Sequence, residues 1–144
     1  MKENEMRLEF PSRPENVAFA RTTVAAFASQ LDPTLPELAD ISTAVSEAVT
    51  NAVVHAYPEG EGPVRIHVRL AGRRVMIEVS DEGRGIADLA AARRFGSSTR
   101  PGERMGIGLS LIEACMDRVE ISSEGGTRIY MEKTLGEQRG GSDE

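Results

Sequence analysis

The sequence lacks the features that mark disulfide-stapled, secreted or membrane-spanning proteins. It has no tryptophan and a single cysteine, Cys115, which cannot form an internal disulfide. No apolar run reaches the roughly 18 residues needed to span a bilayer, and residues 1–10 lack the apolar segment of a secretory signal. We therefore expect a cytoplasmic protein with no membrane association.

Basic residues are also scarce relative to acidic ones. The chain has 17 Lys and Arg against 23 Asp and Glu, which gives a net charge of −6 at pH 7. Binding along nucleic acid requires a basic face, so this balance argues against direct contact with DNA or RNA. It leaves open a protein partner with a basic surface. The two histidines, His55 and His67, have no zinc-ligand spacing around them.

The residues that are present predict one globular domain. With 144 residues, 40% of them hydrophobic, the chain is long enough to bury a single core. We place this domain at residues 1–135, and we expect the polar tail at 136–144 to be disordered.

The periodicity of the apolar residues predicts the elements of the fold. Spacing typical of helices occurs at 15–30, 35–54 and 107–116, with a shorter helix expected at 88–94. Alternation typical of strands occurs at 6–10, 64–70, 75–79, 119–122 and 127–133. This order predicts an α/β fold, a two-layer sandwich with helices on one face of a mixed, mostly antiparallel sheet.

A polar stripe interrupts the apolar pattern of the helix at 35–54. Glu47, Asn51 and His55 are four residues apart, so they lie on one face of that helix. Asn51 either caps a loop or presents its oxygen to Mg²⁺, which prefers oxygen ligands. Glu47 is either a solvated carboxylate or a general base for an attacking hydroxyl. His55 is expected to be a structural hydrogen-bonding residue.

A second polar feature follows the strand at 75–79. Asp81 precedes Gly83 and Gly85 in the run D-E-G-R-G-I. Such residues are common in ordinary turns. Alternatively, the carboxylate accepts a hydrogen bond from an adenine amino group, and the glycines let the backbone approach the base closely.

A third feature is the run G-E-R-M-G-I-G-L at 102–109, which brings glycines and a cation to the start of the helix expected at 107–116. A helix N-terminus of this kind binds phosphates, although the same glycines serve in simple turns. Arg104 is either a phosphate clamp or a solvated side chain. Thr127, after two glycines, is either an ordinary strand residue or a hydroxyl contact near adenine.

Taken in order, these motifs resemble the GHKL superfamily of ATP-binding domains, which includes gyrase, Hsp90, histidine kinases and MutL. The stretches at 19–27, 44–57 and 103–108 are similar to the anti-sigma-factor serine kinases, most of all to their sporulation branch. The likeness extends over residues 5–134. Met105 departs from it, because sporulation members carry Ser or Gly at that position.

The resemblance implies the Bergerat ATP-binding fold, with ATP or ADP as the ligand. Asn51 would hold Mg²⁺, and Glu47 would deprotonate a serine hydroxyl. Gly106 and Gly108 would contact the phosphates, and Arg104 would approach the γ-phosphate.

The resemblance also implies how the base is recognised. Asp81 would read adenine in a pocket shaped by Gly83 and Gly85. Thr127 would support this pocket from the neighbouring strand.

The implied partners are proteins. The chain would form a homodimer that binds and inhibits a sporulation sigma factor of the sigma-F type when ATP is bound. It would also phosphorylate a serine of an anti-anti-sigma protein, and the exposed face of the first helix, including Arg21, is the expected partner surface. Two alternatives are a nucleotide-gated sigma-binding module without kinase activity and a stress-response kinase of the sigma-B type.

Overall fold

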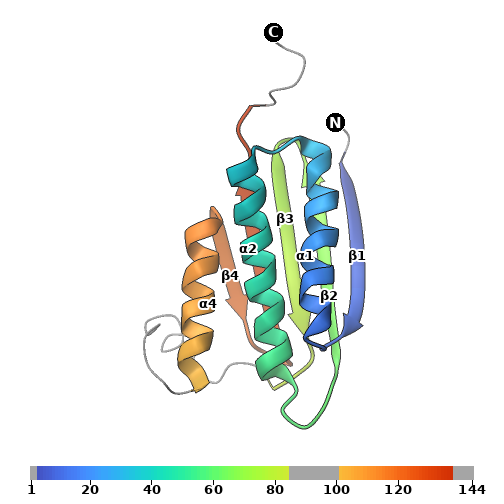
Figure 1. Cartoon of the computed structure of the whole chain (residues 1–144), viewed down its shortest axis with the longest axis vertical. Coiled ribbons are helices and arrows are strands. Elements are labelled where there is room, and N and C mark those ends of the chain that lie inside the picture. Colours follow the sequence, from blue (N-terminus) through green and yellow to red (C-terminus); the bar gives the residue numbers. More distant parts are fainter. Residues whose placement is uncertain (1–2, 85–100, 138–144) are drawn as a thin grey trace.

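The sheet is built from the alternating segments of the sequence, as the computed structural model shows (Figure 1). The structure describes residues 3–84 and 101–137, and the side chains of 101–107 lie outside this description. Its five strands lie in the order β1-β2-β3-β5-β4, with the bounds Asn4–Pro11, Pro63–Ala71, Arg74–Asp81, Thr127–Thr134 and Arg118–Ser122. All pairings between these described strands are antiparallel, so the sheet is more regular than the mixed sheet that was predicted.

The register of the strands separates an apolar face from a charged one. Ile66 of β2 pairs with Leu8 of β1 and with Val79 of β3, so apolar side chains of neighbouring strands meet. Side chains alternate across a strand, and the intervening residues therefore lie on the opposite face. Ion pairs cover that face, among them Arg65 Nε at 2.8 Å from Glu9 Oε1.

The helices cover the apolar face of the sheet (Figure 1), which confirms the predicted two-layer sandwich. Their bounds are Glu15–Ala28 for α1, Leu35–Asn51 for α2 and Pro101–Cys115 for α4. A 3-10 turn, η1 (Ser29–Leu31), extends α1, and a π-helical turn, η2 (Ala52–Ala56), extends α2. The predicted helix at 35–54 is therefore α-helical only as far as Asn51. No helix of the described residues is both long and apolar enough to cross a bilayer.

The start of α2 is fixed by a capping box. The Glu37 N–H donates to Thr34 Oγ1 at 3.1 Å, and the Thr34 N–H donates to Glu37 Oε1 at 2.8 Å. Pro36 occupies the first turn, where its missing N–H leaves no hydrogen bond unmade. The helix that carries the predicted polar stripe thus begins at a well-defined residue.

The start of α4 differs from the prediction. The helix expected at 107–116 begins at Pro101, so Gly106 and Gly108 lie within it and do not open it. Glycine disfavours helix, which led the prediction to begin the helix too late. Proline suits a first helical turn, and packing of α4 against the rest of the helical layer outweighs the glycine penalty. The shorter helix predicted at 88–94 lies outside the described residues.

The core lies between the sheet and the helices. It is made of aliphatic side chains with almost no exposed surface, including Ile41, Val45, Val49, Ile66, Ile77, Ile112, Ile129 and Met131. Burying each such side chain stabilises the fold by roughly 1.5–3 kcal/mol relative to leaving it in water. The core therefore fixes the position of the C-terminal end of α2 relative to the ends of β3 and β5.

Candidate functional site

A pocket lies between the end of α2 and the first described side chains of α4. It is lined by Glu47, Thr50, Asn51, Val54, His55, Gly108 and Leu109. The predicted polar stripe therefore does face one pocket. A Cβ atom built on Gly108 would lie 3.0 Å from Glu47 Oε1, so this glycine allows α4 to pass close to the carboxylate.

Glu47 and Asn51 are half-buried in this pocket, and neither side chain makes a hydrogen bond with the described residues. Asn51 also makes no side-chain cap to the helical turn that follows it. Of the two interpretations of Asn51, capping thus finds no support in the described part of the chain. No described residue occupies the Asn51 amide oxygen, a ligand type suited to a hard cation, or the Glu47 carboxylate, a group suited to accept a proton.

The end of α2 is widened and capped at η2. In a π-helical turn the hydrogen bonds span five residues, and such turns are frequent at functional sites. The Arg84 backbone N–H donates to the Ala56 carbonyl at 3.0 Å, and Arg84 Nε donates to the His55 carbonyl at 2.9 Å. A cation at this end also complements the helix dipole. The helix that carries Glu47 and Asn51 is thereby joined to the turn after β3.

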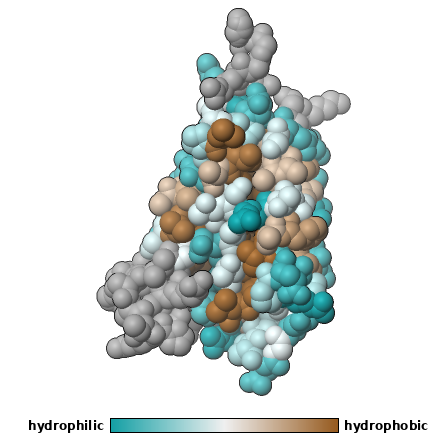
Figure 2. All heavy atoms as spheres, viewed as in Figure 1, coloured by the Kyte–Doolittle hydropathy of each residue, from teal (hydrophilic) through white to brown (hydrophobic). Residues whose placement is uncertain are grey.

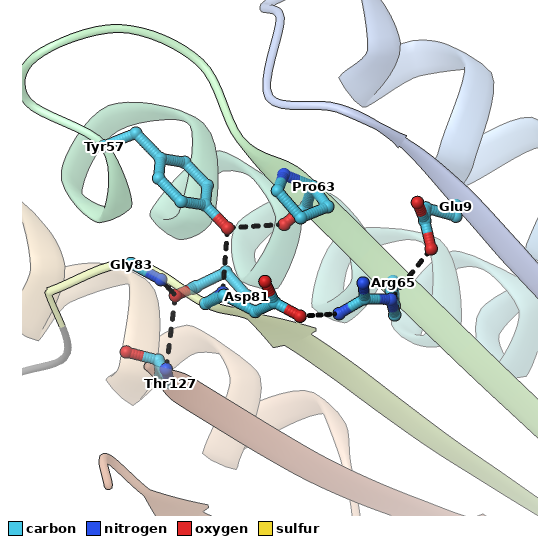
Figure 3. A network of polar contacts seen from close by, with 8 residues as sticks. Glu9, Tyr57, Pro63, Arg65, Asp81, Gly83 and Thr127 are labelled. Atoms are coloured by element: carbon cyan, nitrogen blue, oxygen red, sulfur yellow. Dashed lines mark hydrogen bonds and ion pairs between the residues drawn. The ribbon is translucent and has the colours of Figure 1, made fainter. Parts of the chain in front are cut away.

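Asp81 is a buried carboxylate at the end of β3, with 8% of its surface exposed. Its Oδ1 accepts the Gly83 N–H at 2.9 Å and the Thr127 N–H at 3.2 Å (Figure 3). Its Oδ2 accepts no hydrogen bond from the described residues. One oxygen is therefore held in place by the backbone, and the other has no donor among the described residues, so it suits an amino group of a ligand.

Burial raises the pKa of Asp81, and the N–H groups of Gly83 and Thr127 act in the opposite direction. Because desolvation prevails, the free protein carries a carboxylate that is poorly satisfied by its surroundings. A ligand that donates a hydrogen bond to Oδ2 would improve this situation. Burial of Asp81 thus favours a ligand that donates a hydrogen bond to this carboxylate.

Two glycines allow the backbone to pack closely around Asp81. A Cβ atom on Gly83 would lie 2.1 Å from the Ala56 carbonyl oxygen, and one on Gly126 would lie 2.0 Å from the Asp81 carbonyl oxygen. Gly126 also has φ +121, a conformation that L side chains rarely adopt. The prediction included Gly83 but not Gly126, although its place directly before Thr127 was a signal for it.

The remaining predicted residues stay predictions. Gly85 lies outside the described residues. Arg104 and Gly106 belong to the first turns of α4, where the structure describes the backbone alone. Contacts of these residues with phosphates are therefore still expectations of the sequence.

Two residues of the site were not predicted from the sequence. Tyr57 follows η2, and its hydroxyl bonds both to the Pro63 carbonyl and to the Glu82 N–H (Figure 3). Arg84 bonds to the end of η2 as described above. Both residues bond to backbone atoms, which no pattern of side chains reveals; the only signal was an aromatic residue directly after the polar stripe.

Known proteins are similar to this chain in sequence and in architecture. Residues 10–133 match the family described as histidine kinase-like ATPase domain. The anti-sigma F factor of Pasteuria penetrans is 52% identical over 140 residues, which cover 94% of this chain and 93% of the relative. The anti-sigma F factor of Clostridium kluyveri is 46% identical over 138 residues, which cover 94% of this chain and 97% of the relative.

A solved structure agrees with the fold. The crystal structure of the RsbU and RsbW domains of Rv1364c from Mycobacterium tuberculosis superposes with a TM-score of 0.68 at 23% identity. The match covers 92% of this chain and 32% of the other chain. At this identity the likeness shows the shared arrangement of helices on a sheet.

Proposed function

Because the chain belongs to the histidine kinase-like ATPase family and, within it, to the anti-sigma F factors, we propose that it is an ATP-dependent protein serine kinase that inhibits a sigma factor. One observation carries this proposal. The pocket contains the side chains of Glu47 and Asn51, which make no hydrogen bond with the described residues, and it is joined, through the end of α2, to the turn in which Asp81 Oδ2 faces no described donor. Two adjacent sites of this kind suit the two ends of ATP.

The residues present fit an adenine nucleotide with Mg²⁺. The buried Asp81 carboxylate would accept a hydrogen bond from the exocyclic amine of adenine. Because Gly83 has no side chain, the turn can pack directly against Ala56. Asn51 would hold Mg²⁺ through its amide oxygen. When bound, Mg²⁺ neutralises charge on the phosphates and orients them for transfer.

Glu47 would act as the general base. A serine oxygen of the substrate protein attacks the γ-phosphorus, the bond from that phosphorus to the bridging oxygen breaks, and ADP departs with the electron pair. The proton of the serine hydroxyl passes to Glu47. A carboxylate that has no partner among the described residues is suited to accept it. Gly106, Gly108 and Arg104 would bind phosphate oxygens from α4.

The partners follow from the family. The sigma factor would be of the sigma-F type and bound in the ATP state, and the phosphorylated serine would belong to an anti-anti-sigma protein. The names of the relatives, at 45–52% identity, favour sigma-F over the stress-response sigma-B type. We also propose a homodimer in the cytoplasm, without direct contact with DNA or membrane.

The surface of α1 is the proposed contact for a protein partner. Phe19 is 51% exposed, which is unusual for a large aromatic side chain, and Arg21 is exposed on the same helix. Figure 2 shows that hydrophobic side chains on the helical face of the molecule are spread in small groups and do not form one continuous patch. Such a surface suits a partner that is released as well as bound.

A second candidate function is a nucleotide-gated sigma-binding module without transfer. Glu47 argues against it, because a module that only binds ATP needs no base beside the nucleotide. The two functions differ in one observable, the movement of the γ-phosphate to protein.

The test is a transfer assay with labelled Mg·ATP and an anti-anti-sigma protein. We expect label on a serine of that protein, and a loss of roughly 100-fold or more in the Glu47→Gln variant. ATP affinity of the variant should stay within about twofold, since Gln has the same shape. Glu59→Gln, in an exposed loop, is the matched control and should transfer at the wild-type rate.

Each contrary result has a distinct meaning. Transfer at the wild-type rate by Glu47→Gln would remove Glu47 from the role of base. A wild-type protein that transfers no label, yet retains a sigma factor only with ATP, would establish the gated binding module.

A further inference from the structure

The hydroxyl of Tyr57 lies between two segments of backbone. It donates to the Pro63 carbonyl at 2.6 Å, and it accepts the Glu82 N–H at 2.8 Å (Figure 3). Pro63 is the first residue of β2, whereas Glu82 is the first residue of the turn after β3. A single oxygen atom thus connects the start of one strand to the turn that follows Asp81.

The ring of Tyr57 is fixed as firmly as its hydroxyl. A Cβ atom on Gly62 would lie 2.2 Å from the Cε1 atom of the ring, so the ring packs directly on the backbone of this glycine. Burial raises the pKa of Tyr57, while the Glu82 N–H acts the other way. The phenol is therefore protonated at neutral pH and able to donate to Pro63.

The turn is held on the opposite side as well. The Ala56 carbonyl accepts the Arg84 N–H at 3.0 Å, and Asp81 Oδ1 accepts the Thr127 N–H at 3.2 Å. The turn after Asp81 is therefore held by Tyr57 and by the end of η2. Asp81 itself is held by the start of β5. Of these supports, the Tyr57 hydroxyl can be removed by a substitution, Tyr57→Phe, that keeps the rest of the side chain in place.

We propose that Tyr57 is a specificity-determining positioning residue, whose hydroxyl holds the turn so that Asp81 Oδ2 accepts the amine of a 6-aminopurine and rejects a 6-oxopurine. The inference rests on the proposed nucleotide site. A carboxylate oxygen attracts an amino group and repels a carbonyl oxygen, but only where it cannot move aside. Without the Tyr57 hydroxyl the turn can shift, so the loss of affinity for guanine relative to adenine becomes smaller.

The experiment compares two phenylalanine variants of the full chain. Tyr57→Phe keeps the ring on Gly62 and removes only the hydroxyl. Tyr130→Phe is the matched control, because its hydroxyl donates to Glu132 at 2.7 Å on the charged face of the sheet. Dissociation constants of Mg·ATP and Mg·GTP are measured by competition with a fluorescent ADP analogue, and the ratio of the two constants gives the base preference.

We expect Tyr57→Phe to reduce the preference for ATP over GTP by roughly tenfold, the effect of losing a well-placed hydrogen bond and leaving its partners unpaired. Tyr130→Phe should keep the wild-type preference. Hydrogen exchange of the Glu82 amide in the nucleotide-free protein should become faster in Tyr57→Phe alone. A lower unfolding midpoint in Tyr57→Phe with an unchanged base preference would overturn the proposal, because the hydroxyl would then only stabilise the fold.

A double-mutant cycle tests whether Tyr57 acts through Asp81. In an Asp81→Asn background, Tyr57→Phe should change the base preference little, because the group that Tyr57 positions is already altered. Additive effects of the two substitutions would overturn the proposal.

The outcomes also separate this inference from the proposed function. Wild-type protein that prefers ATP but transfers no phosphate contradicts the kinase and leaves Tyr57 to be judged by its own variants. Wild-type transfer together with an unaltered preference in Tyr57→Phe contradicts the inference alone. Wild-type protein that binds neither nucleotide contradicts both.

Discussion

At the scale of the residue, the site depends on polar groups that the fold leaves incompletely satisfied. Asp81 is the clearest case, since burial raises its pKa above the ordinary value of 3.8. The folded chain therefore holds the proton more tightly than the unfolded chain. It follows that ionised Asp81 lowers the free energy of unfolding at pH above the raised pKa, and that this cost disappears below pH 3.8.

This cost leads to a prediction for Asp81→Asn. The Asn oxygen can still accept the N–H groups of Gly83 and Thr127, so we expect the free energy of unfolding at pH 7 to be equal to or higher than that of the wild type. ATP affinity should fall at least about tenfold, because an NH₂ group would face the adenine amine. Urea unfolding at pH 7 and pH 3 and calorimetric titration with ATP measure the two effects.

In acid the two proteins should converge, because Asp81 is then protonated in both the folded and the unfolded chain. A variant that is less stable at pH 7 and binds ATP as the wild type does would contradict both the burial cost and the adenine role.

Single residues also show which parts of the site a sequence reveals. Glu47 and Asn51 were predicted because they form a polar stripe in an apolar helical pattern, and Asp81 because it follows a strand and precedes two glycines. Tyr57 was not, because its partners are the Pro63 carbonyl and the Glu82 N–H, and nearly every residue of a chain offers backbone groups of these two kinds. Only the three-dimensional path of the chain brings them together.

At the scale of the element, the site is the meeting of a helix end with a strand end. The turn after β3 packs against η2 at one point of closest approach, where Gly83 faces the Ala56 carbonyl oxygen. The two elements can meet only while position 83 lacks a side chain. The absence of a Cβ atom at Gly83 thus allows the short distance between the two elements.

A prediction follows for Gly83→Ala. The added methyl would overlap the Ala56 carbonyl, so we expect a loss of about 1–3 kcal/mol in the free energy of unfolding. Nucleotide affinity should fall as well, because the turn that carries Asp81 must move. Chemical unfolding and a nucleotide titration measure the two losses.

Gly60→Ala is the control for this substitution. Nothing lies within 4 Å of the place where its Cβ would be, so we expect a change of at most about 0.5 kcal/mol. Equal effects of the two substitutions would show that general glycine flexibility, and not the contact with Ala56, determines the result.

The elements also differ in how well the sequence predicts them. The strands β2 and β3 were predicted to within two residues at each end, because the alternation of apolar and polar residues is a local signal. The start of α4 was not, since Gly102, Gly106 and Gly108 disfavour helix locally and only packing in the helical layer offsets this. The insertion of β5 between β3 and β4 is likewise a result of tertiary packing, which no local pattern encodes.

At the scale of the whole molecule, the two ends of the helical layer make different contacts. One end holds the pocket. At the other, the chain after β5 returns to the start of α2, where Glu37 Oε2 accepts the Gly136 N–H at 2.8 Å and Arg73 Nε donates to the Gly136 carbonyl at 2.7 Å (Figure 1). Gly136 was assigned to the disordered tail; residues 138–144 lie outside the described residues, so the tail itself stays a prediction.

The Gly136 contact should make stability depend on pH. The N–H groups of Gly136 and Thr34 lower the pKa of Glu37 from its ordinary value of 4.5. A lowered carboxyl pKa contributes stability that is present above pH 4.5 and is lost as the pH falls through the lowered value. Glu37→Gln should therefore lose about 0.5 kcal/mol at pH 7, a modest amount because solvent screens the exposed part of the carboxylate.

Urea unfolding between pH 2.5 and pH 7 measures this difference. The gap between Glu37→Gln and the wild type should close below pH 4.5. Glu124→Gln, exposed in the turn between β4 and β5, is the control and should be as stable as the wild type at pH 7. A gap for Glu37→Gln that persists in acid would show that shape and not charge is responsible.

The π-helical turn η2 has a consequence for insertions and deletions in this part of the chain. A π turn contains one residue more than an α turn closed by the same kind of hydrogen bond. Because η2 already holds this extra residue, deleting a residue from the regular part of α2 would rotate every later residue by about 100° about the helix axis. Tyr57 would then point away from Glu82. We therefore expect this stretch to tolerate exchanges of side chains far better than any change in its length.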